Sequence, residues 1–290
     1  MIGARPAPLI DRHQAAERPL PLAQAPAARL ARAFGVMTDI DDTLTREGAI
    51  EPEALQALHA LQAAGVPVIA ITGRPMGWSE PFARDWPVAA IVAENGGVAL
   101  IREGRAVAVE YAQPDHERAH HARRLREVAE RVLREVPQAR LARDSAGRVT
   151  DIAVDHSEFH RLEPAAIEQV VALMREEGMN ATVSSIHVNG WFGTHTKWTG
   201  ATWMLQRLFG RELHEEVARW VYVGDSTNDQ AMFERFELSV GVANLRDFAA
   251  QLQVWPAWIT QQERGRGFAE LARALLAARG AAPVPGTPAP

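Results

Sequence analysis

Two aspartates in the segment DIDDTLT have the spacing that a nucleophile and an acid-base partner need. Asp39 and Asp41 stand two positions apart at the end of the apolar run AFGVMTDI. Two such carboxylates can divide the work, since one can attack or hold a cation while the other moves protons. The alternative is an acidic turn that caps a helix, because Asp and Thr are common in such loops. The pair indicates a catalytic site only if other polar groups lie beside it.

Two more polar loops follow apolar runs further along the chain. ITGRP supplies Thr72, Gly73 and Arg74, and a hydroxyl with free N–H groups at a helix N-terminus is able to hold a phosphate. Simple capping by Thr72 is the alternative. VGDSTND supplies Asp225 and Asp229, whose oxygens suit a hard cation without His or Cys. Three such loops at three strand ends predict one shared site at the edge of a sheet.

The segment THTKWTG contains Lys197, the only lysine among 31 Lys and Arg residues. Its ammonium is a compact point charge, whereas the guanidinium of arginine is a wide planar fork. One isolated lysine can be a chance of composition, so its position relative to the other motifs decides what it means.

Short apolar runs place these motifs at the ends of strands. The runs are rich in β-branched residues and nearly continuous in hydrophobicity, as strands buried on both faces of a parallel sheet are. They cover residues 33–40, 66–72, 88–94, 220–225 and 238–243. PEALQALHALQAAG, between the first two runs, has leucines at helical spacing and Gly65 as a C-cap. Strand, helix and strand in this order predict an α/β fold with a Rossmann-like, doubly wound parallel sheet.

The segment between about 98 and 190 interrupts this alternation. VALIREGRAVAVE predicts a hairpin, and helices over 117–135 and 164–177 alternate with strands after it. We therefore expect an inserted α+β module. The predicted division is a disordered, Pro/Ala-rich segment (1–32), the first part of the core (33–111), the module (112–189), the second part of the core (190–277) and a disordered tail (278–290).

Two groups of polar residues in the module have open interpretations. If SSIHVNGWF is one strand, Ser185, His187 and Asn189 share a face that would roof the site and contact a sugar, while Ile186 points the other way. The alternative is an ordinary solvent-facing strand. The histidines of DHERAHHARR have helical spacing that a metal site could use, but we interpret them as part of a solvated face.

The motifs together resemble the haloacid dehalogenase-like (HAD) phosphatase superfamily. DIDDTLT, ITGR, the lone Lys197 and GDSTND occur in the order and approximate spacing of its four motifs. The insertion resembles the type IIB (C2B) cap of Cof-like, sucrose-phosphate and mannosyl-3-phosphoglycerate phosphatases, and AENGG and ERGRGFAEL resemble that branch as well. The resemblance covers roughly residues 34–275.

The resemblance implies a role for each motif. Asp39 would be the nucleophile that becomes an aspartyl-phosphate, and Asp41 the general acid and then the base. Asp39, the backbone carbonyl of Asp41 and Asp225 would hold Mg²⁺, while Asp229 supports the metal or Lys197. The residues expected to bind substrate are Thr72, Gly73, Arg74, Lys197, Asn228, His187 and Asn189.

The implied function is a Mg²⁺-dependent phosphatase that acts on a small phosphorylated metabolite, with a sugar phosphate as our first choice. The second Asp of DIDDTLT separates this function from that of the dehalogenases. Phosphomannomutases share the fold and the cap class, so a phosphomutase is one alternative. A binding or regulatory protein without catalysis is the other.

Composition narrows the remaining classes of function. A net charge of −5 gives no electrostatic footprint for nucleic acid or an anionic membrane. The absence of cysteine excludes disulfides, thiolate catalysis and Cys-ligated metal sites. No apolar run approaches the length of about 18 residues that spans a bilayer, and the N-terminus lacks the apolar core of a signal peptide. We expect a cytoplasmic enzyme.

Overall fold

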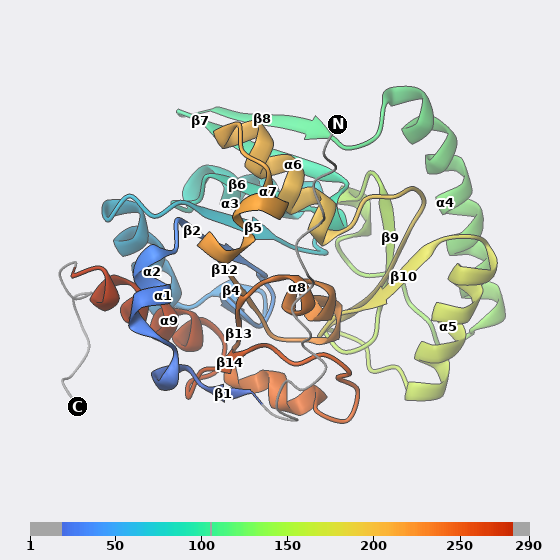
Figure 1. Cartoon of the computed structure of the whole chain (residues 1–290). Coiled ribbons are helices and arrows are strands. Elements are labelled where there is room, and N and C mark those ends of the chain that lie inside the picture. The colour runs from blue at the N-terminus through green and yellow to red at the C-terminus, as the bar shows by residue number, and fades with distance from the viewer. Residues whose placement is uncertain (1–18, 105, 281–290) are drawn as a thin grey trace, which may run out of the picture.

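The computed structural model describes residues 19–104 and 106–280. Its main element is a nine-stranded sheet in the order β1-β14-β13-β12-β2-β5-β6-β7-β8 (Figure 1). Taken in this order, each strand up to β6 is parallel to its neighbours. β7 and β8 continue the sheet beyond β6 as an antiparallel hairpin. The bounds are β1 Leu20–Pro21, β2 Gly35–Thr38, β5 Val68–Ile71, β6 Ala90–Ala93, β7 Val98–Glu103, β8 Ala106–Tyr111, β12 Trp220–Gly224, β13 Leu238–Gly241 and β14 Trp258–Ile259.

Helices cover both faces of this sheet. Val36 and Val221 point to one face, and Met37 and Tyr222 point to the other. The first face carries α1 (Ala27–Arg32), α2 (Pro52–Ala63), α3 (Met76–Asp85) and α9 (Arg264–Ala278). The second carries α6 (Lys197–Phe209), α7 (Leu213–Glu216) and α8 (Gln230–Arg235). Burial on both faces explains why the strand sequences are continuously apolar. The predicted α/β, doubly wound fold is confirmed.

A second sheet with its own core lies at one end of the main sheet (Figure 1). It has the antiparallel order β10-β11-β9, and two helices pack on it around a separate apolar cluster. The bounds are α4 Asp115–Glu135, β9 Asp151–Asp155, α5 Pro164–Glu176, β10 Asn180–Val183 and β11 His187–Trp191. We call this unit the cap and the rest the core. The division at residues 112 and 189 stays a prediction, and β11 runs two residues past the second boundary.

The prediction of a disordered segment over residues 1–32 is wrong for residues 19–32. β1 extends the main sheet by pairing with β14, and α1 packs on α9. Leu22 and Leu30 are buried there, so two leucines anchor a segment whose Pro and Ala content suggested disorder. Residues 1–18 and 281–290 lie outside the described residues.

The segment SSIHVNGWF is not one strand. β11 begins only at His187, because the Ser184 hydroxyl accepts the N–H groups of Ile186 and His187 at 3.3 and 3.0 Å and forms a turn. His187 and Asn189 still share a face of β11, but Ser185 and Ile186 lie in the turn.

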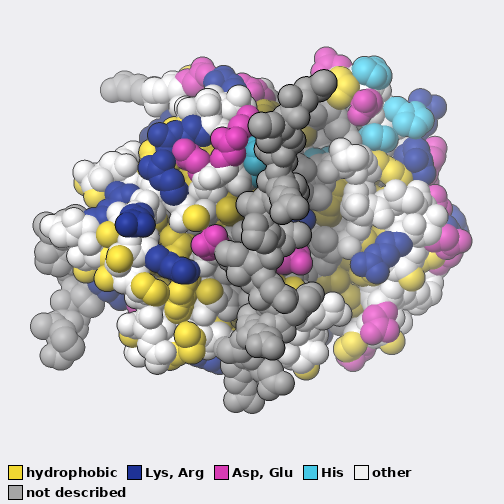
Figure 2. Space-filling model, viewed as in Figure 1, with side chains coloured by type: hydrophobic (Ala, Val, Ile, Leu, Met, Phe, Trp, Pro, Cys, Tyr) yellow, Lys and Arg dark blue, Asp and Glu magenta, His cyan; other side chains and the backbone are white. Residues whose placement is uncertain are grey.

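Short elements complete the described chain. They are the hairpin β3 (Thr45–Arg46) and β4 (Ala49–Ile50), and the 3₁₀ helices η1 (Leu22–Gln24), η2 (Glu94–Gly96), η3 (Ser145–Gly147), η4 (Val217–Arg219), η5 (Thr227–Asp229) and η6 (Ala243–Phe248). Within the described ranges, no helix combines the length and apolar character that a bilayer crossing requires. His116 and His120 of α4 are exposed, as expected of a solvated face, and histidines gather beside basic side chains at that end of the molecule (Figure 2). His121 differs, because it is half-buried and stacks on the ring of Phe192.

A close backbone contact between η2 and α6 fixes the start of α6 at Lys197. Gly96 has a φ of +109°, and a Cβ atom there would overlap the carbonyl oxygen of Thr196. A Cβ atom on Gly200 would lie 2.9 Å from Cα of Gly96. Thr196 caps α6 by a reciprocal pair of hydrogen bonds with Thr199. The start of α6 is therefore set by backbone contact as well as by its cap.

We expect Gly96→Ala to lower the free energy of unfolding by more than about 2 kcal/mol, because it adds a steric clash to an unfavourable φ. Gly65→Ala is the control, since Gly65 also has a positive φ, of +68°, but open space around it. That substitution is expected to cost only about 1 kcal/mol. Urea unfolding measures both, and equal losses would contradict the proposed close contact.

Candidate active site

Three polar loops meet at the carboxyl ends of adjacent strands. β2 lies between β12 and β5, so the loops that begin with Asp39, Asp225 and Thr72 are neighbours. This is the edge at which open α/β sheets bind ligands. The prediction that these loops come together is confirmed by the strand order.

Lys197 joins two of the aspartates. Its Nζ atom lies 2.6 Å from Oδ1 of Asp39 and 2.8 Å from Oδ1 of Asp229. The lysine side chain is 6% exposed, and both carboxylates are buried as well. Lys197 is the first residue of α6, and its position is set by Thr196, the N-cap residue of that helix. The single lysine of the sequence is thus the ammonium group of the carboxylate cluster.

Asp229 is held by donors at both of its oxygens. Besides Lys197, Oδ1 accepts the hydroxyl of Tyr222 at 2.5 Å. Oδ2 accepts the backbone N–H groups of Asp225 and Ser226 at 3.0 and 3.2 Å. Four hydrogen bonds use most of the acceptor capacity of a carboxylate. Asp229 is therefore built to hold Lys197 and the β12 loop in place.

The aspartates leave room for a cation. One oxygen from each of Asp39, Asp225 and Asp229 lies within 4.8 Å of the others. Oδ2 of Asp225 is buried and accepts no hydrogen bond from any residue that the structure describes. An orphaned carboxylate oxygen is costly, and hard cations such as Mg²⁺ bind oxygen ligands of this type. Residues present at the site therefore fit a divalent cation.

The charges of the cluster do not balance without a proton or a cation. Burial raises the pKa of Asp39 to about 8, helped by Asp229 and Asp41 and opposed by Lys197. Burial and the neighbouring Asp39 also raise the pKa of Asp225 well above its usual value. For Lys197, burial alone would lower the pKa, but Asp229 and Asp39 raise it above that of a free lysine. One ammonium cannot neutralise three buried carboxylates, so the cluster favours an added positive charge.

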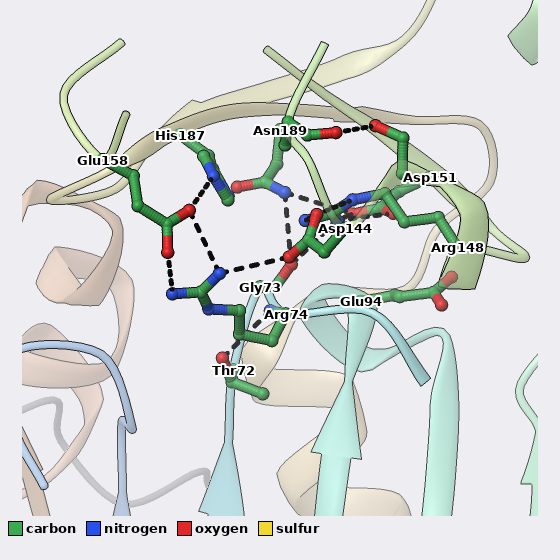
Figure 3. A network of polar contacts seen from close by, with 12 residues as sticks. Thr72, Gly73, Arg74, Glu94, Asp144, Arg148, Asp151, Glu158, His187 and Asn189 are labelled. Carbon is green, nitrogen blue, oxygen red and sulfur yellow. Dashed lines mark hydrogen bonds and ion pairs between the residues drawn. The ribbon is translucent and has the colours of Figure 1, made fainter. Parts of the chain in front are cut away.

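Asp41 lies apart from this cluster, against Arg74. Nε of Arg74 donates to both oxygens of Asp41 at 2.9 and 3.0 Å. Burial raises the pKa of Asp41, and Arg74 opposes that rise. The guanidinium also contacts Glu158 at 2.7 and 3.2 Å and Asp144 at 3.2 Å (Figure 3). Arg74, expected to bind substrate, is thus already bound to three carboxylates of the chain.

The loop after β5 differs from a simple anion site. The Thr72 hydroxyl accepts the N–H of Arg74 at 3.0 Å, and Pro75 precedes α3 instead of opening it. Glu94 accepts the N–H of Met76, the first residue of α3, at 3.0 Å. A carboxylate of the chain thus occupies the first amide of the helix, where a phosphate was expected. The roles of Thr72 and Gly73 toward substrate stay predictions.

The two cap residues of β11 face the core. Nε2 of His187 lies 2.9 Å from Oε2 of Glu158, and Nδ2 of Asn189 donates to the carbonyl of Gly73 and to Asp151, both at 3.2 Å (Figure 3). Both side chains are buried, so the solvent-facing alternative is wrong.

A cavity of about 540 Å³ opens between core and cap. Asp41, Arg74 and Asp225 line it from the core, and Glu158, Phe159 and Ser185 from the cap. The described lining residues do not include His187 or Asn189. Asn228 lies along a neighbouring groove between α5 and α8 instead. Direct substrate contact by these three residues stays a prediction without support from the cavity.

The sequence interpretation missed Tyr222 and Glu158. Tyr222 had a signal, because it stands on β12 three positions before Asp225 and its neighbours in VYVGD are apolar. Glu158 had none, since it follows β9 in a turn in which the Asp155 carboxylate accepts the N–H groups of residues 157, 158 and 159. Only the packing of cap on core brings Glu158 to Arg74.

In the absence of divalent cations, we expect the free energy of unfolding of Asp39→Asn to increase relative to that of the wild type as the pH rises from about 5 to about 8. The folded pKa of Asp39, about 8, is raised above the ordinary 3.8, so its stabilising contribution is complete below that ordinary value and is lost as the pH rises to about 8. The relative gain should reach at least about 2 kcal/mol. Urea unfolding in EDTA measures it, with Asp115→Asn as the control because that side chain is 95% exposed. Parallel pH curves for Asp39→Asn and the wild type would contradict this.

Comparisons with known proteins agree with the site. Residues 36–132 match the model of the haloacid dehalogenase-like hydrolase family. A phosphoglycolate phosphatase from Methanothermobacter thermautotrophicus is 25% identical over 245 residues, which cover 83% of this chain and 98% of that protein. A HAD/COF-like hydrolase from Plasmodium vivax shares the fold with a TM-score of 0.63 at 17% identity, covering 87% of this chain and 98% of that one. The sucrose-phosphatase of Synechocystis, solved with sucrose and phosphate, gives a TM-score of 0.60 at 17% identity, covering 84% and 98%. Residues 36–132 are thus similar to haloacid dehalogenase-like hydrolases, and the chain shares the fold of the two solved structures.

Proposed function

We propose that the chain is a Mg²⁺-dependent phosphatase that forms an aspartyl-phosphate on Asp39. The observation that carries this proposal is the buried Lys197 ammonium between Asp39 and Asp229. A carboxylate repels a dianionic phosphate unless positive charge offsets the repulsion. Phosphoryl transfer depends chiefly on such neutralisation and on in-line positioning. A buried lysine that is hydrogen-bonded to the attacking carboxylate supplies the positive charge and orients the carboxylate.

The proposed reaction has two displacements at phosphorus. In the first, a carboxylate oxygen of Asp39 attacks, the bond from phosphorus to the leaving oxygen breaks, and Asp41 gives that oxygen a proton. In the second, Asp41 takes a proton from water, whose oxygen attacks the same phosphorus and releases inorganic phosphate and free Asp39. Lys197 and Thr72 would hold the phosphoryl oxygens. Arg74 orients Asp41 through the two hydrogen bonds from its Nε atom.

The metal would be held by Asp39, the backbone carbonyl of Asp41 and Asp225. The orphaned Oδ2 atom of Asp225 supports this assignment. Mg²⁺ bound there would neutralise charge on the phosphoryl group. Asp229 supports Lys197 through the contacts described above, and we assign it no place in the metal shell.

The substrate class is a small phosphorylated metabolite, and we propose a sugar phosphate. A cavity of about 540 Å³ has room for a leaving group of that size. One relative is named for phosphoglycolate and one structural neighbour for sucrose phosphate, so both kinds of leaving group occur on this fold. We place the enzyme in the cytoplasm, where such metabolites are found.

A phosphomutase is the second candidate on the same site. It would use the same nucleophile and acid-base pair but return the phosphoryl group to a bound sugar. Release of inorganic phosphate, instead of a rearranged sugar phosphate, separates the two. A protein without catalysis is the third candidate, and the pairing of Asp41 with a nucleophile two residues away argues against it.

We expect Asp39→Asn to abolish phosphate release and Lys197→Arg to lower kcat by at least about a hundredfold. The first variant loses the nucleophile. The second keeps the charge but places a planar fork between two aspartates that lie 2.6 and 2.8 Å from a compact ammonium. A phosphate-release assay on a panel of sugar phosphates, with Mg²⁺ or with EDTA, measures both effects.

Asp115→Asn again serves as the control, and it should retain wild-type turnover. The proposal fails if the wild type releases phosphate from no member of the panel. It also fails if Asp39→Asn is as active as the wild type. Near-normal turnover by Lys197→Arg would show that the shape of the cation is unimportant.

A further inference from the structure

The cavity between core and cap carries an excess of negative charge. Two arginines, Arg74 and Arg264, line it. Six carboxylates line it as well, namely Asp41, Asp42, Glu47, Glu158, Asp225 and Asp247. The charge of a bound Mg²⁺ would be cancelled by a phosphate dianion. The remaining negative charge of the lining carboxylates therefore faces the alcohol part of the phosphate ester.

Both arginines are already paired with carboxylates of the chain. Nε of Arg264 lies 2.7 Å from Oδ1 of Asp42. Arg74 is bound along one edge by Asp41, and its terminal nitrogens contact Glu158 at 2.7 and 3.2 Å. Arg74 therefore has little capacity left for an anion on a ligand, whereas Arg264 is paired through Nε with Asp42 and through Nη1 with Glu263 at 3.3 Å.

Glu158 is the carboxylate that completes the pairing of Arg74 from the cap. Its Oε2 atom also contacts His187 at 2.9 Å, which fixes the side chain from behind. Burial alone would raise the pKa of Glu158, but hydrogen bonds from His187 and Arg74 bring it to about 2. Glu158 is thus ionised at any physiological pH, and its charge faces the cavity permanently.

A leaving group with its own carboxylate would meet an unfavourable environment here. It would lose water beside Glu158 and Asp41, and both arginines that line the cavity are already paired with carboxylates of the chain. An unpaired charge is expensive to bury. Hydroxyl groups would instead find acceptors in the same carboxylates. Phe159, which is 56% exposed at the cavity, adds the flat apolar surface that a carbon skeleton can cover.

We propose that Glu158 is a specificity-determining residue that occupies Arg74 and thereby selects phosphate esters of neutral polyols over those of hydroxy acids. The proposal rests on the phosphatase function above and narrows its substrate class. It distinguishes this chain from an enzyme that needs a free arginine for the carboxylate of its substrate.

The test compares two esters with the same three-carbon skeleton, glycerol 3-phosphate and 3-phosphoglycerate. They differ in a hydroxymethyl group against a carboxylate. The wild type should prefer glycerol 3-phosphate by at least about tenfold in kcat/KM, which corresponds to about 1.4 kcal/mol. Glu158→Gln removes one negative charge from the three carboxylates bound to Arg74 and leaves Asp41 and Asp144 in place. It should therefore reduce this preference by at least about tenfold, mainly through a lower KM for 3-phosphoglycerate.

Glu47→Gln is the matched control, because it makes the same change at an exposed carboxylate of the same cavity. Its preference should stay within about twofold of the wild type, since exposed charges are screened by solvent. The proposal is overturned if the wild type accepts both esters equally. It is also overturned if Glu158→Gln slows both esters by the same factor, as loss of support for Arg74 and Asp41 alone would do.

Turnover of p-nitrophenyl phosphate separates this failure from failure of the proposed function. No turnover with Mg²⁺ would reject the phosphatase itself. Turnover without the expected preference would reject only the role of Glu158. If neither three-carbon ester is hydrolysed, their inhibition constants against p-nitrophenyl phosphate provide the same comparison in the wild type and both variants.

Discussion

One buried ammonium group faces three buried carboxylates at the carboxyl ends of the central strands, and this imbalance of charge organises the site. Lys197 contacts Asp39 and Asp229 directly, and Asp225 completes the cluster with an oxygen that lacks a protein donor. Such a cluster is costly to bury unless a proton or a cation joins it. Three features of the fold hold the cluster together. The parallel sheet brings the aspartates to one edge, the N-cap residue Thr196 makes Lys197 the first residue of α6, and the Tyr222 hydroxyl binds Asp229.

Carboxylate contacts also join the cap to the core. Glu94 of the core accepts the N–H groups of Val149 and Thr150 and the Thr150 hydroxyl, while Glu158 of the cap binds Arg74. Because Arg74 in turn holds Asp41, the position of the cap and the orientation of the proposed acid are linked through one guanidinium. Opening of the cap would break the contact between Glu158 and Arg74, and closure would restore it.

Local sequence patterns predicted the motif loops of the core and both helices of the cap, but not the ordered residues 19–32 or the contacts between cap and core. Asp39, Asp225 and Lys197 were predictable because each follows a local pattern, and the parallel order of the strands brings such patterns to one edge. Glu158 has no local pattern, since its contacts to Arg74 and His187 span 84 and 29 positions of the chain. The strand expected over residues 184–192 begins only at His187, because the Ser184 hydroxyl accepts two backbone N–H groups and turns the chain. Long-range packing and local side-chain hydrogen bonds both lie outside hydrophobic periodicity.

The central claim is that Asp39 attacks phosphorus while Lys197 neutralises the charge that arrives with it. A crystal structure of the protein with Mg²⁺ and beryllofluoride, which imitates a phosphoryl group bonded to a carboxylate, tests this claim most directly. The account predicts beryllium bonded to a carboxylate oxygen of Asp39, fluorine atoms in contact with Nζ of Lys197, and the metal bound to Asp39 and Asp225. Beryllofluoride bonded to another residue, or a metal bound away from Asp225, would contradict it.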